Sequence, residues 1–201
     1  MTTEGGKAPM RIFRQGLGPH ALPLAMSGVK LGERMLYVGG GKPRLFAALA
    51  AKAGLTGRAC AVAEGSREAD ALQRAAAREG VLVEIAVGAS GAFPHDAESF
   101  DVTVIDGTDG SFGSMNANDR AHRLRETVRV MRGGGRLLVI EHVGGGLRAL
   151  FGGARTAPDY RSAGGAKAAL EEAGFRPARV VAEREHLRFT EGIKPARPSR
   201  P

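Results

Sequence analysis

The sequence predicts one α/β domain built on a mainly parallel sheet. From Arg34 onward, short apolar runs alternate with longer segments of helical periodicity, as expected when strands and helices alternate. Glycine accounts for 30 of the 201 residues, and many glycines cluster directly after apolar runs, which is typical of functional turns at strand ends. A chain of this length with 43% hydrophobic residues can bury a full core.

The first half of the chain predicts two strands and two helices in alternation. We expect strands over 34–38 (RMLYV) and 58–63 (RACAVA), and helices over 43–54 (PRLFAALAAKAG) and 66–80 (SREADALQRAAAREG). Pro43 stands at the first position of the first helix and Gly54 just beyond its end, the usual asymmetry of helix ends. Ser66 can cap the second helix, and Gly80 ends it.

The second half continues the alternation and ends differently. The predicted elements are strands over 81–87, 100–106 and 135–141, helices over 118–131 and 161–174, and a final pair of strands over 176–185 and 186–192. Asn118 or Asp119 can cap the helix over 118–131. Too few residues separate the last two strands for a crossover helix, so if they are adjacent they can only form a hairpin, and we expect the parallel sheet to end in one antiparallel strand.

Three segments make up the predicted domain organisation. Residues 1–10 are expected to be a flexible leader, residues 11–193 a single domain, and residues 194–201 a basic disordered tail. The segment 11–32 contains Gly16, Gly18, Pro19 and Pro23, which exclude a long helix there.

Composition narrows the possible partners. The formal net charge of +8 permits acidic partners, but tryptophan is absent and only two tyrosines are present, so platforms for base stacking are scarce and nucleic acid is not the favoured ligand. The single cysteine, Cys60, excludes an intrachain disulfide and is expected to be a buried structural thiol. We expect no membrane span, no signal peptide and a cytoplasmic location. The oligomeric state cannot be predicted.

The stretch LYVGGGKPRLF, residues 36–46, is the first candidate ligand site. Ligands of parallel sheets bind at the carboxyl ends of the strands, where glycines allow close approach and a helix start attracts negative charge. The next strand ends at Glu64, whose carboxylate could accept hydrogen bonds from both hydroxyls of a ribose. Alternatively, Glu64 is an ordinary solvated carboxylate at a strand end.

Several motifs in order resemble the class I S-adenosylmethionine-dependent methyltransferases, especially the small-molecule, quinone-biosynthesis-like (type 11) branch. The similarity runs from about Gly32 to Ile193. It rests on LYVGGGKPRL, AVAEGS, GASGAFPHDAESFDVTVID, RETVRVMRGGGRLLVIE and the closing AGFRPARVVAERE with FTEG. The resemblance implies a Rossmann-like three-layer sandwich with a seven-stranded, mainly parallel sheet in the order 3-2-1-4-5-7-6, in which strand 7 is antiparallel.

The sequence departs from the family pattern mainly at the cofactor site. Tyr37 stands where the family usually has an acidic residue that helps to hold the methionine ammonium, and Lys42 and Pro43 replace a threonine and a glycine. Ala89 stands where many members have an aspartate that binds the adenine amino group, and Ser90 is a possible substitute. Each lost hydrogen bond to a charged group would weaken binding by about 1.5–3 kcal/mol unless neighbours compensate.

The resemblance implies methyl transfer from S-adenosyl-L-methionine to a small-molecule acceptor. The alternatives are a methyltransferase-like binding or scaffold protein without activity and, resting on charge alone, a nucleic-acid methyltransferase. The expected cofactor-binding residues share the carboxyl edge of the sheet; they are Gly39, Gly40, Gly41, Glu64, Gly65, Ala89, Ser90 and Asp106.

Two residues are candidates for catalysis. Asp106 ends the fourth strand and could act on the substrate, or it could be a plain turn-forming aspartate. His142 ends the fifth strand and could be a general base, or it could be an ordinary loop histidine. Phe112 and Met115 could line the acceptor pocket or belong to the core, and GGG at 144–146 is expected to begin a substrate loop. No His or Cys spacing predicts a metal site.

Overall fold

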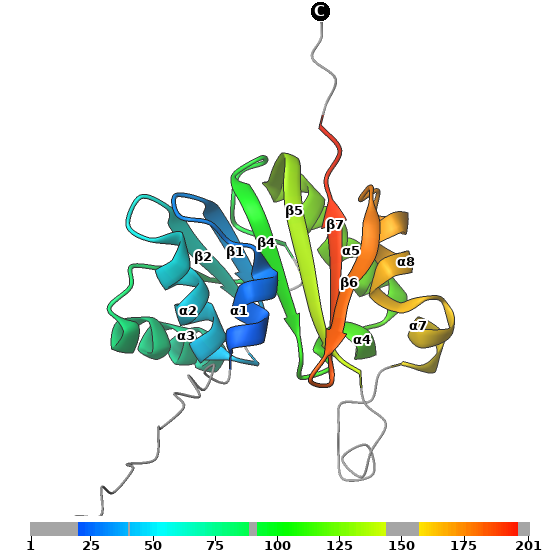
Figure 1. Ribbon diagram of the computed structural model, residues 1–201, viewed down its shortest axis with the longest axis horizontal. Helices are drawn as coiled ribbons and strands as arrows, with labels where there is room; N and C mark the ends of the chain where they lie inside the picture. Colours follow the sequence, from blue (N-terminus) through cyan, green and yellow to red (C-terminus); the bar gives the residue numbers. More distant parts are fainter. Residues whose placement is uncertain (1–19, 40, 89–91, 144–156, 197–201) are drawn as a thin grey trace, which may run out of the picture.

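The computed structural model describes residues 20–39, 41–88, 92–143 and 157–196. In this part of the chain, seven strands form one sheet in the order β3-β2-β1-β4-β5-β7-β6 (Figure 1). The pairs β3-β2, β2-β1, β1-β4 and β4-β5 are parallel, whereas β7 runs antiparallel to both β5 and β6. The predicted fold class, strand order and antiparallel strand 7 are confirmed. The strands are β1 (Arg34–Val38), β2 (Arg58–Ala63), β3 (Glu84–Val87), β4 (Phe100–Gly107), β5 (Met131–His142), β6 (Ala178–Arg184) and β7 (Leu187–Ile193).

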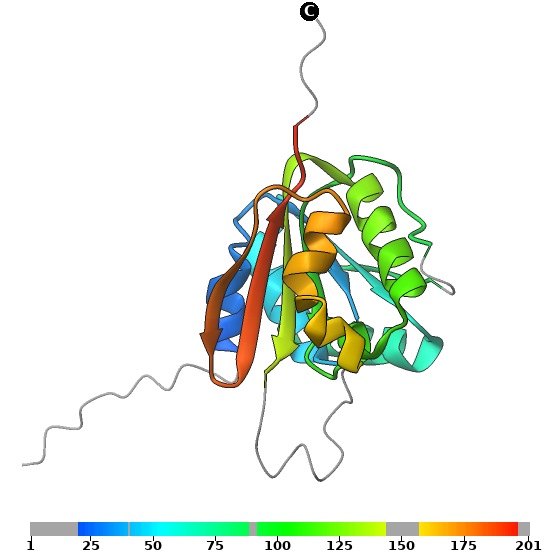
Figure 2. The ribbon, with the colours of Figure 1, turned by 90° about the vertical axis from the view of Figure 1, so that its right-hand side faces the viewer.

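Helices cover both faces of the sheet and make it the middle layer of three. The helices are α1 (Ala21–Ser27), α2 (Pro43–Ala53), α3 (Ser66–Glu79), α4 (Ser111–Ser114), α5 (Ala117–Val130), α7 (Pro158–Ser162) and α8 (Gly165–Glu172). Side chains of α2 and α3 pack with the sheet in one core cluster, and side chains of α1 contact that cluster. Side chains of α4, α5, α7 and α8 form the other cluster. Figure 2 shows α5 and α8 on the face opposite α1.

The helix α2 follows β1 almost at once and packs its apolar face on the sheet. Leu45, Phe46 and Leu49 are fully buried at the spacing of one helical face. Pro43 occupies the first turn, where its missing amide costs no intrahelical hydrogen bond. Gly54 ends the helix with φ of 70°. The residues predicted for this helix are therefore confirmed.

Two predicted helix caps are wrong. Ser66 is the first residue of α3 instead of its cap, and the capping position is held by Gly65, which makes no side-chain cap hydrogen bond. At α5 the cap is Asn116, whose side chain accepts a hydrogen bond from the backbone N–H of Asp119 at 2.9 Å. Because Asn116 lies two residues before the predicted cap at Asn118, the helix begins earlier than its periodicity indicated.

Other element boundaries also differ from prediction. The strand predicted over 81–87 is regular only from Glu84, and β5 extends the predicted 135–141 at both ends. The helix predicted over 161–174 is divided into α7 and α8, because Gly164 takes a φ of 96° and interrupts the helical hydrogen bonds. Cys60 is free and buried, as predicted.

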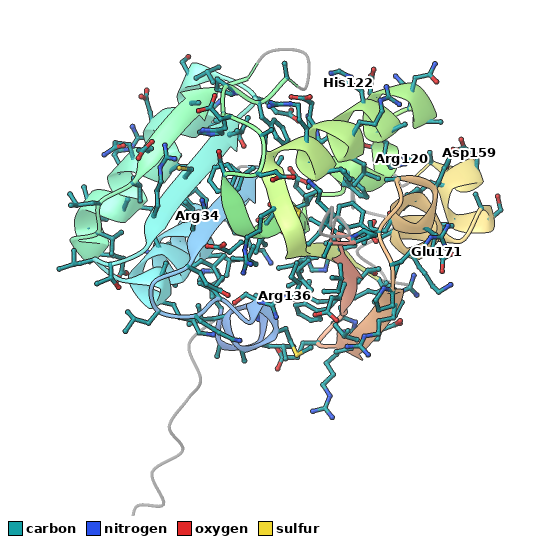
Figure 3. The ribbon with its side chains drawn as sticks, turned by 90° about the horizontal axis from the view of Figure 1, so that it is seen from above. Arg34, Arg120, His122, Arg136, Asp159 and Glu171 are labelled. Carbon is teal, nitrogen blue, oxygen red and sulfur yellow. The ribbon has the colours of Figure 1, made fainter. Side chains whose placement is uncertain are left out.

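The amino-terminal edge of the sheet is held by Asp101. Its carboxylate accepts hydrogen bonds from the backbone N–H of Arg34 at 2.8 Å and from the Arg34 guanidinium, and it also pairs with Arg132. Although burial raises the pKa of Asp101, the hydrogen bonds from Arg34 outweigh it and lower the pKa below its usual value. Arg34 lies on this edge, opposite the edge where ligands are expected (Figure 3).

The ordered structure continues through the end of β7. The backbone of Lys194 exchanges hydrogen bonds with Gly134 and Gly135, and its ammonium donates to the carbonyl of Met131 at 2.6 Å. Lys194, which was assigned to the tail, is therefore anchored to the start of β5. Residues 1–19, which include the predicted leader, and residues 197–201 lie outside the described residues.

Candidate functional site

The carboxyl ends of β1, β2 and β4 lie side by side at one edge of the sheet. In the strand register, Val38 pairs with Val62 on one side and with Ile105 on the other. The residues that follow these three positions therefore meet at this edge. They include Gly39 and Asp106, with Glu64 two residues beyond Val62.

Gly39 is required by its conformation and by its surroundings. Its φ is 109°, a region that side-chain-bearing residues rarely adopt. A Cβ atom there would lie 2.8 Å from the carbonyl oxygen of Asp106. The first glycine of the run thus lets the β1–α2 loop pass directly against the end of β4.

The loop borders a pocket of about 410 Å³. Three of its lining side chains are carboxylates and one is a guanidinium, so its charge favours an organic cation. The residues that line it are Gly39, Gly41, Glu64, Gly65, Arg67, Glu68, Ala71, Asp109 and Ser111. Four predicted cofactor-binding residues, namely Gly39, Gly41, Glu64 and Gly65, are brought together here, whereas Gly40, Ala89 and Ser90 lie outside the described residues.

Glu64 is held in place from two sides. Its carboxylate oxygen Oε1 accepts a hydrogen bond from Arg123 of α5 at 2.8 Å, and its backbone N–H donates to Glu68 at 2.8 Å. Its side chain is 55% exposed, whereas that of Arg123 is only 13% exposed. Among the described residues, Oε2 of Glu64 has no hydrogen-bond donor, so this oxygen can accept one from a ligand.

Asp106 turns away from the pocket. It is only 1% exposed, and its Oδ2 accepts a hydrogen bond from the hydroxyl of Tyr37 at 2.5 Å. Its Oδ1 accepts from the backbone N–H of Thr108 at 3.0 Å and from the Thr108 hydroxyl at 2.6 Å. Burial, followed by the charge and hydrogen bond of Asp106, raises the pKa of Tyr37 well above its usual value. Asp106 therefore supports the loop from beneath.

Asp109 is a pocket residue that sequence reasoning missed. It lies in the turn between β4 and α4, where its Oδ1 accepts hydrogen bonds from the backbone N–H and the hydroxyl of Ser111. Its Cγ lies 3.5 Å from where a Cβ of Gly41 would be. The sequence showed only that an aspartate, in TDGS, follows three residues after the end of a predicted strand. The direction of a side chain in such a turn cannot be predicted, because a turn has no periodic pattern.

A second cluster lies at the end of β5. The hydroxyl of Tyr160 donates to the Glu141 carboxylate at 2.7 Å, and the guanidinium of Arg120 lies over the Tyr160 ring at 4.2 Å. Burial raises the pKa of Glu141 above its usual value, although the hydrogen bond from Tyr160 opposes the shift. Phe112 packs edge-on against Tyr160 and is 1% exposed, so it belongs to the core beneath this cluster.

His142 follows Glu141 and is exposed. Its Nδ1 lies 3.1 Å from the carbonyl oxygen of His186. Since a carbonyl only accepts hydrogen bonds, this contact is a hydrogen bond when Nδ1 carries the proton, which leaves Nε2 of the neutral ring as a proton acceptor.

The described residues contain neither a group of side chains that could hold a metal ion nor a helix that could span a membrane. No group of three or more His, Cys, Asp and Glu side chains in them is arranged to hold a metal ion. None of the helices described here combines the length and the hydrophobicity that crossing a bilayer requires.

Comparison with known proteins decides the family. A family model described as the ubiE/COQ5 methyltransferase family matches residues 21–148, more than half of the chain. The chain belongs to this family. It is a class I S-adenosylmethionine-dependent methyltransferase of the type 11 branch, and S-adenosyl-L-methionine is the cofactor expected of it. No protein among the curated ones matches the sequence.

Solved structures share the fold at low sequence identity. A SAM-dependent methyltransferase from Aquifex aeolicus is 18% identical, with a TM-score of 0.69 over 88% of this chain and 90% of that one. The YcgJ protein from Bacillus subtilis is 13% identical, with a TM-score of 0.63 over 88% and 97% of the two chains. The [4+2]-cyclase SpnF is 17% identical, with a TM-score of 0.63 over 88% and 79%. Proteins of this fold therefore include one named for a different reaction, so the acceptor cannot be inferred from fold alone.

The acidic pocket fits the expected cofactor. S-adenosylmethionine carries a sulfonium, an ammonium and a carboxylate group and is therefore a net cation, and the pocket offers the carboxylates of Glu64, Glu68 and Asp109 with the single guanidinium of Arg67. Gly39 leaves no side chain between the loop and the strand ends, and Glu64 has an oxygen free for a ribose hydroxyl. The pocket therefore has an acidic side chain near Gly41, namely Asp109 on the loop after β4, although position 37 has none.

Proposed function

We propose that this chain transfers the methyl group of S-adenosylmethionine to a small-molecule acceptor. The observation that carries the proposal is the pocket beside Gly39, whose three carboxylates suit a cationic cofactor. A cytoplasmic location and a single domain over residues 11–193 remain predictions that accompany this proposal.

The residues of the pocket take distinct roles in the proposal. Gly39 and Gly41 border the methionine part of the cofactor, with Gly40 between them, and Asp109 attracts the ammonium group. Glu64 accepts a hydrogen bond from the ribose through Oε2, and Gly65 leaves room beside it. By the family resemblance, Ala89 and Ser90 border the adenine.

The acceptor is proposed to approach over the ends of β4 and β5. When bound, S-adenosylmethionine supplies an electrophilic methyl group, which passes to a nucleophile of the acceptor as the carbon–sulfur bond breaks. The protein mainly has to align the two reactants, and a base is needed only if the acceptor must lose a proton. His142 is proposed as that base, because Nε2 of its neutral ring is a proton acceptor.

Asp106 has a different role in this proposal. Both of its carboxylate oxygens already accept hydrogen bonds from Tyr37 and Thr108, and the side chain is buried. We therefore assign it to positioning the loop that carries Gly39. Direct contact of Asp106 with cofactor or substrate was the initial prediction, and the geometry gives it less support.

Calorimetric titration with S-adenosylmethionine tests the proposal. A Glu64→Ala variant should bind the cofactor more weakly by about 1–3 kcal/mol, because one hydrogen bond to a charged group is lost. A Glu79→Ala variant is the matched control, since it removes an exposed carboxylate from the far end of α3. If the wild-type chain binds no cofactor at millimolar concentration, the enzyme proposal fails and the scaffold alternative takes its place. Equal affinities of the two variants would refute the role of Glu64.

The scaffold alternative has less support than the enzyme. It was motivated by Tyr37, Pro43 and Ala89. However, Pro43 lies where a helix needs no amide donor, and Tyr37 holds a buried carboxylate. The nucleic-acid alternative still rests on net charge, and a steep salt dependence of RNA or DNA binding would be its evidence.

A further inference from the structure

A second pocket of about 450 Å³ lies beside the cofactor pocket and has the opposite charge. It shares Gly41 and Ala71 with the acidic pocket. Five of its lining side chains are basic and none is acidic. The residues that line it are His20, Gly41, Lys42, Pro43, Arg44, Ala71, Arg74, Ala75 and Arg78.

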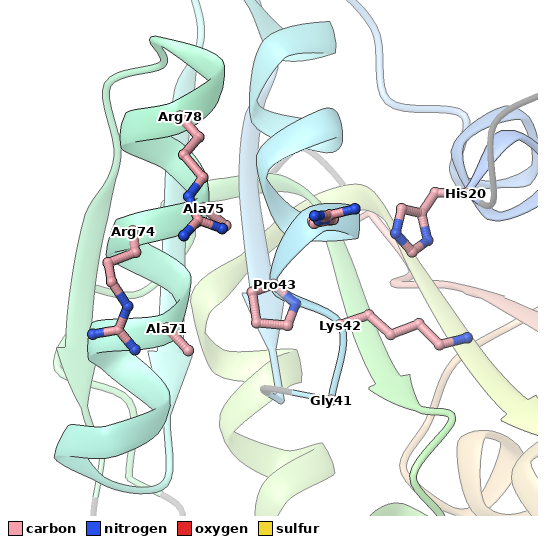
Figure 4. Close-up of a pocket in the computed structure, with 9 residues that line it drawn as sticks. His20, Gly41, Lys42, Pro43, Ala71, Arg74, Ala75 and Arg78 are labelled. Carbon is pink, nitrogen blue, oxygen red and sulfur yellow. The ribbon is translucent and has the colours of Figure 1, made fainter.

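The shape of this basic pocket follows from two helices. On α3, Ala71 and Ala75 are one turn apart and leave a hollow, while Arg74 and Arg78 stand one turn apart on its border. Figure 4 shows Arg74 and Arg78 on one side of Pro43. On the other side are Lys42 and His20, which precede α2 and α1 (Figure 4).

The cations around this pocket are not neutralised by the protein. Within the described residues, Lys42, Arg44, Arg74 and Arg78 form no ion pair with a carboxylate. The first turn of α2 adds the positive end of its helix dipole.

His20 also lines this pocket. Its Nδ1 is buried and has no hydrogen-bond partner among the described residues. The pKa of His20 is lowered first by burial and then by the charges of Lys42 and Arg44, whereas the charge of Asp106 raises it.

We propose that this pocket binds the diphosphate group of a small molecule. Arginine guanidinium groups match phosphate oxygens in pairs, and a cluster of four cations exceeds what one carboxylate or one phosphate would neutralise. The volume is that of a small-molecule site, and the lining contains no Phe, Tyr or Trp on which the bases of single-stranded RNA would stack. The site adjoins the acidic pocket, with which it shares Gly41 and Ala71, and it does not depend on the proposed methyl transfer.

Calorimetry with inorganic pyrophosphate tests the site on the full chain. The wild-type chain should show saturable binding at submillimolar to millimolar concentration. An Arg74→Gln/Arg78→Gln double variant should weaken it at least ~10-fold, and Arg44→Gln, on the opposite wall, should weaken it in the same direction. Arg125→Gln is the control, because Arg125 is an exposed arginine of α5 that lines neither pocket; it should change the affinity less than ~2-fold.

Three outcomes would overturn the proposal. The first is no pyrophosphate binding, or equal affinity in the double variant and in the Arg125→Gln control. The second is loss of pyrophosphate binding at saturating S-adenosylmethionine, which would make the pocket the carboxylate end of the cofactor site. The third is that a short single-stranded RNA binds more tightly than pyrophosphate and that this binding is lost when Arg74 and Arg78 are replaced. The affinity of the double variant for S-adenosylmethionine is measured separately. This measurement distinguishes failure of the diphosphate site from failure of the proposed methyltransferase activity.

Discussion

At the scale of single residues, Tyr37 changes how the cofactor loop is supported. The family usually places an acidic side chain at this position, and here a fully buried tyrosine donates its hydroxyl to Asp106 instead. A buried carboxylate is costly unless it accepts hydrogen bonds, and Asp106 accepts them from both Tyr37 and Thr108. The tyrosine at position 37 therefore has a structural role, because its hydroxyl binds the carboxylate of Asp106 on the neighbouring strand β4.

Removing the hydroxyl of Tyr37 should destabilise the fold. We expect Tyr37→Phe to lower the free energy of unfolding by about 1–3 kcal/mol, because a buried carboxylate loses a hydrogen bond. Denaturant unfolding of Tyr37→Phe, Asp106→Asn and the double variant completes a mutant cycle. A coupling energy of at least ~1 kcal/mol is expected, and strictly additive effects would show that the two groups do not interact.

The site residues differ in how far the sequence could predict them. Gly39 and Glu64 line one pocket because they follow predicted strands and the strand ends of a parallel sheet share an edge, while their contact with a cofactor stays a prediction. Asp106 was placed on the correct strand end, but its side chain is directed by a tyrosine 69 residues away in sequence, and one sequence gives no sign of that contact. Asp109 was missed because the direction of a side chain in a turn depends on backbone angles that no periodicity reveals.

At the scale of elements, the β1–α2 loop depends on close packing against β4. We expect Gly39→Ala to cost about 2–4 kcal/mol, because its Cβ would meet the Asp106 carbonyl at 2.8 Å and its φ is 109°. Gly80→Ala is a suitable control, since Gly80 also has a positive φ but its Cβ would meet nothing within 4 Å. It should cost only about 1–2 kcal/mol. Thermal or denaturant unfolding measures both, and equal losses would exclude a special role of the contact.

Element order was predictable, whereas element boundaries were only partly so. The alternation of apolar runs and amphipathic segments predicted each strand of the sheet. The short link between the last two strands predicted a hairpin with one antiparallel strand, and the family resemblance implied that this strand is β7. The cap of α5 was misplaced because Asn116, Asn118 and Asp119 are all good capping residues, and only backbone geometry selects among them. The division between α7 and α8 depends on the positive φ of Gly164, which glycine permits but does not require.

At the scale of the whole molecule, charge is distributed unevenly around the carboxyl edge of the sheet. Although the net charge of the chain is +8, one pocket is lined by the carboxylates of Glu64, Glu68 and Asp109. The basic pocket lies directly beside it on the other side of Gly41. A net charge summed over the chain therefore says little about the sign of either site.

Stability should fall on mild acidification because of His20 and His95. Burial is the main cause that lowers the pKa of each, and nearby lysine and arginine charges lower it further, although nearby carboxylates oppose the shift. In the unfolded chain both titrate near ~6.5, so as the pH falls through this value the unfolded state takes up more protons than the folded state. The free energy of unfolding of the wild-type chain should therefore drop between pH 7.5 and 5.5.

The two histidines can be tested together. A His20→Gln/His95→Gln variant should lose less stability than the wild-type chain over the same pH interval, because the groups that differ in proton uptake are gone. Denaturant unfolding at the two pH values measures this difference. Equal slopes for both proteins would show that these histidines do not carry the effect.

A crystal structure of the chain with saturating S-adenosylhomocysteine, the demethylated cofactor product, tests whether the acidic pocket binds the cofactor. We expect the ligand in the pocket of Gly39 and Gly41, with its ribose at Oε2 of Glu64 and its amino group beside Asp109. Ligand density elsewhere on the molecule, or a pocket without ligand at saturating concentration, would contradict this expectation.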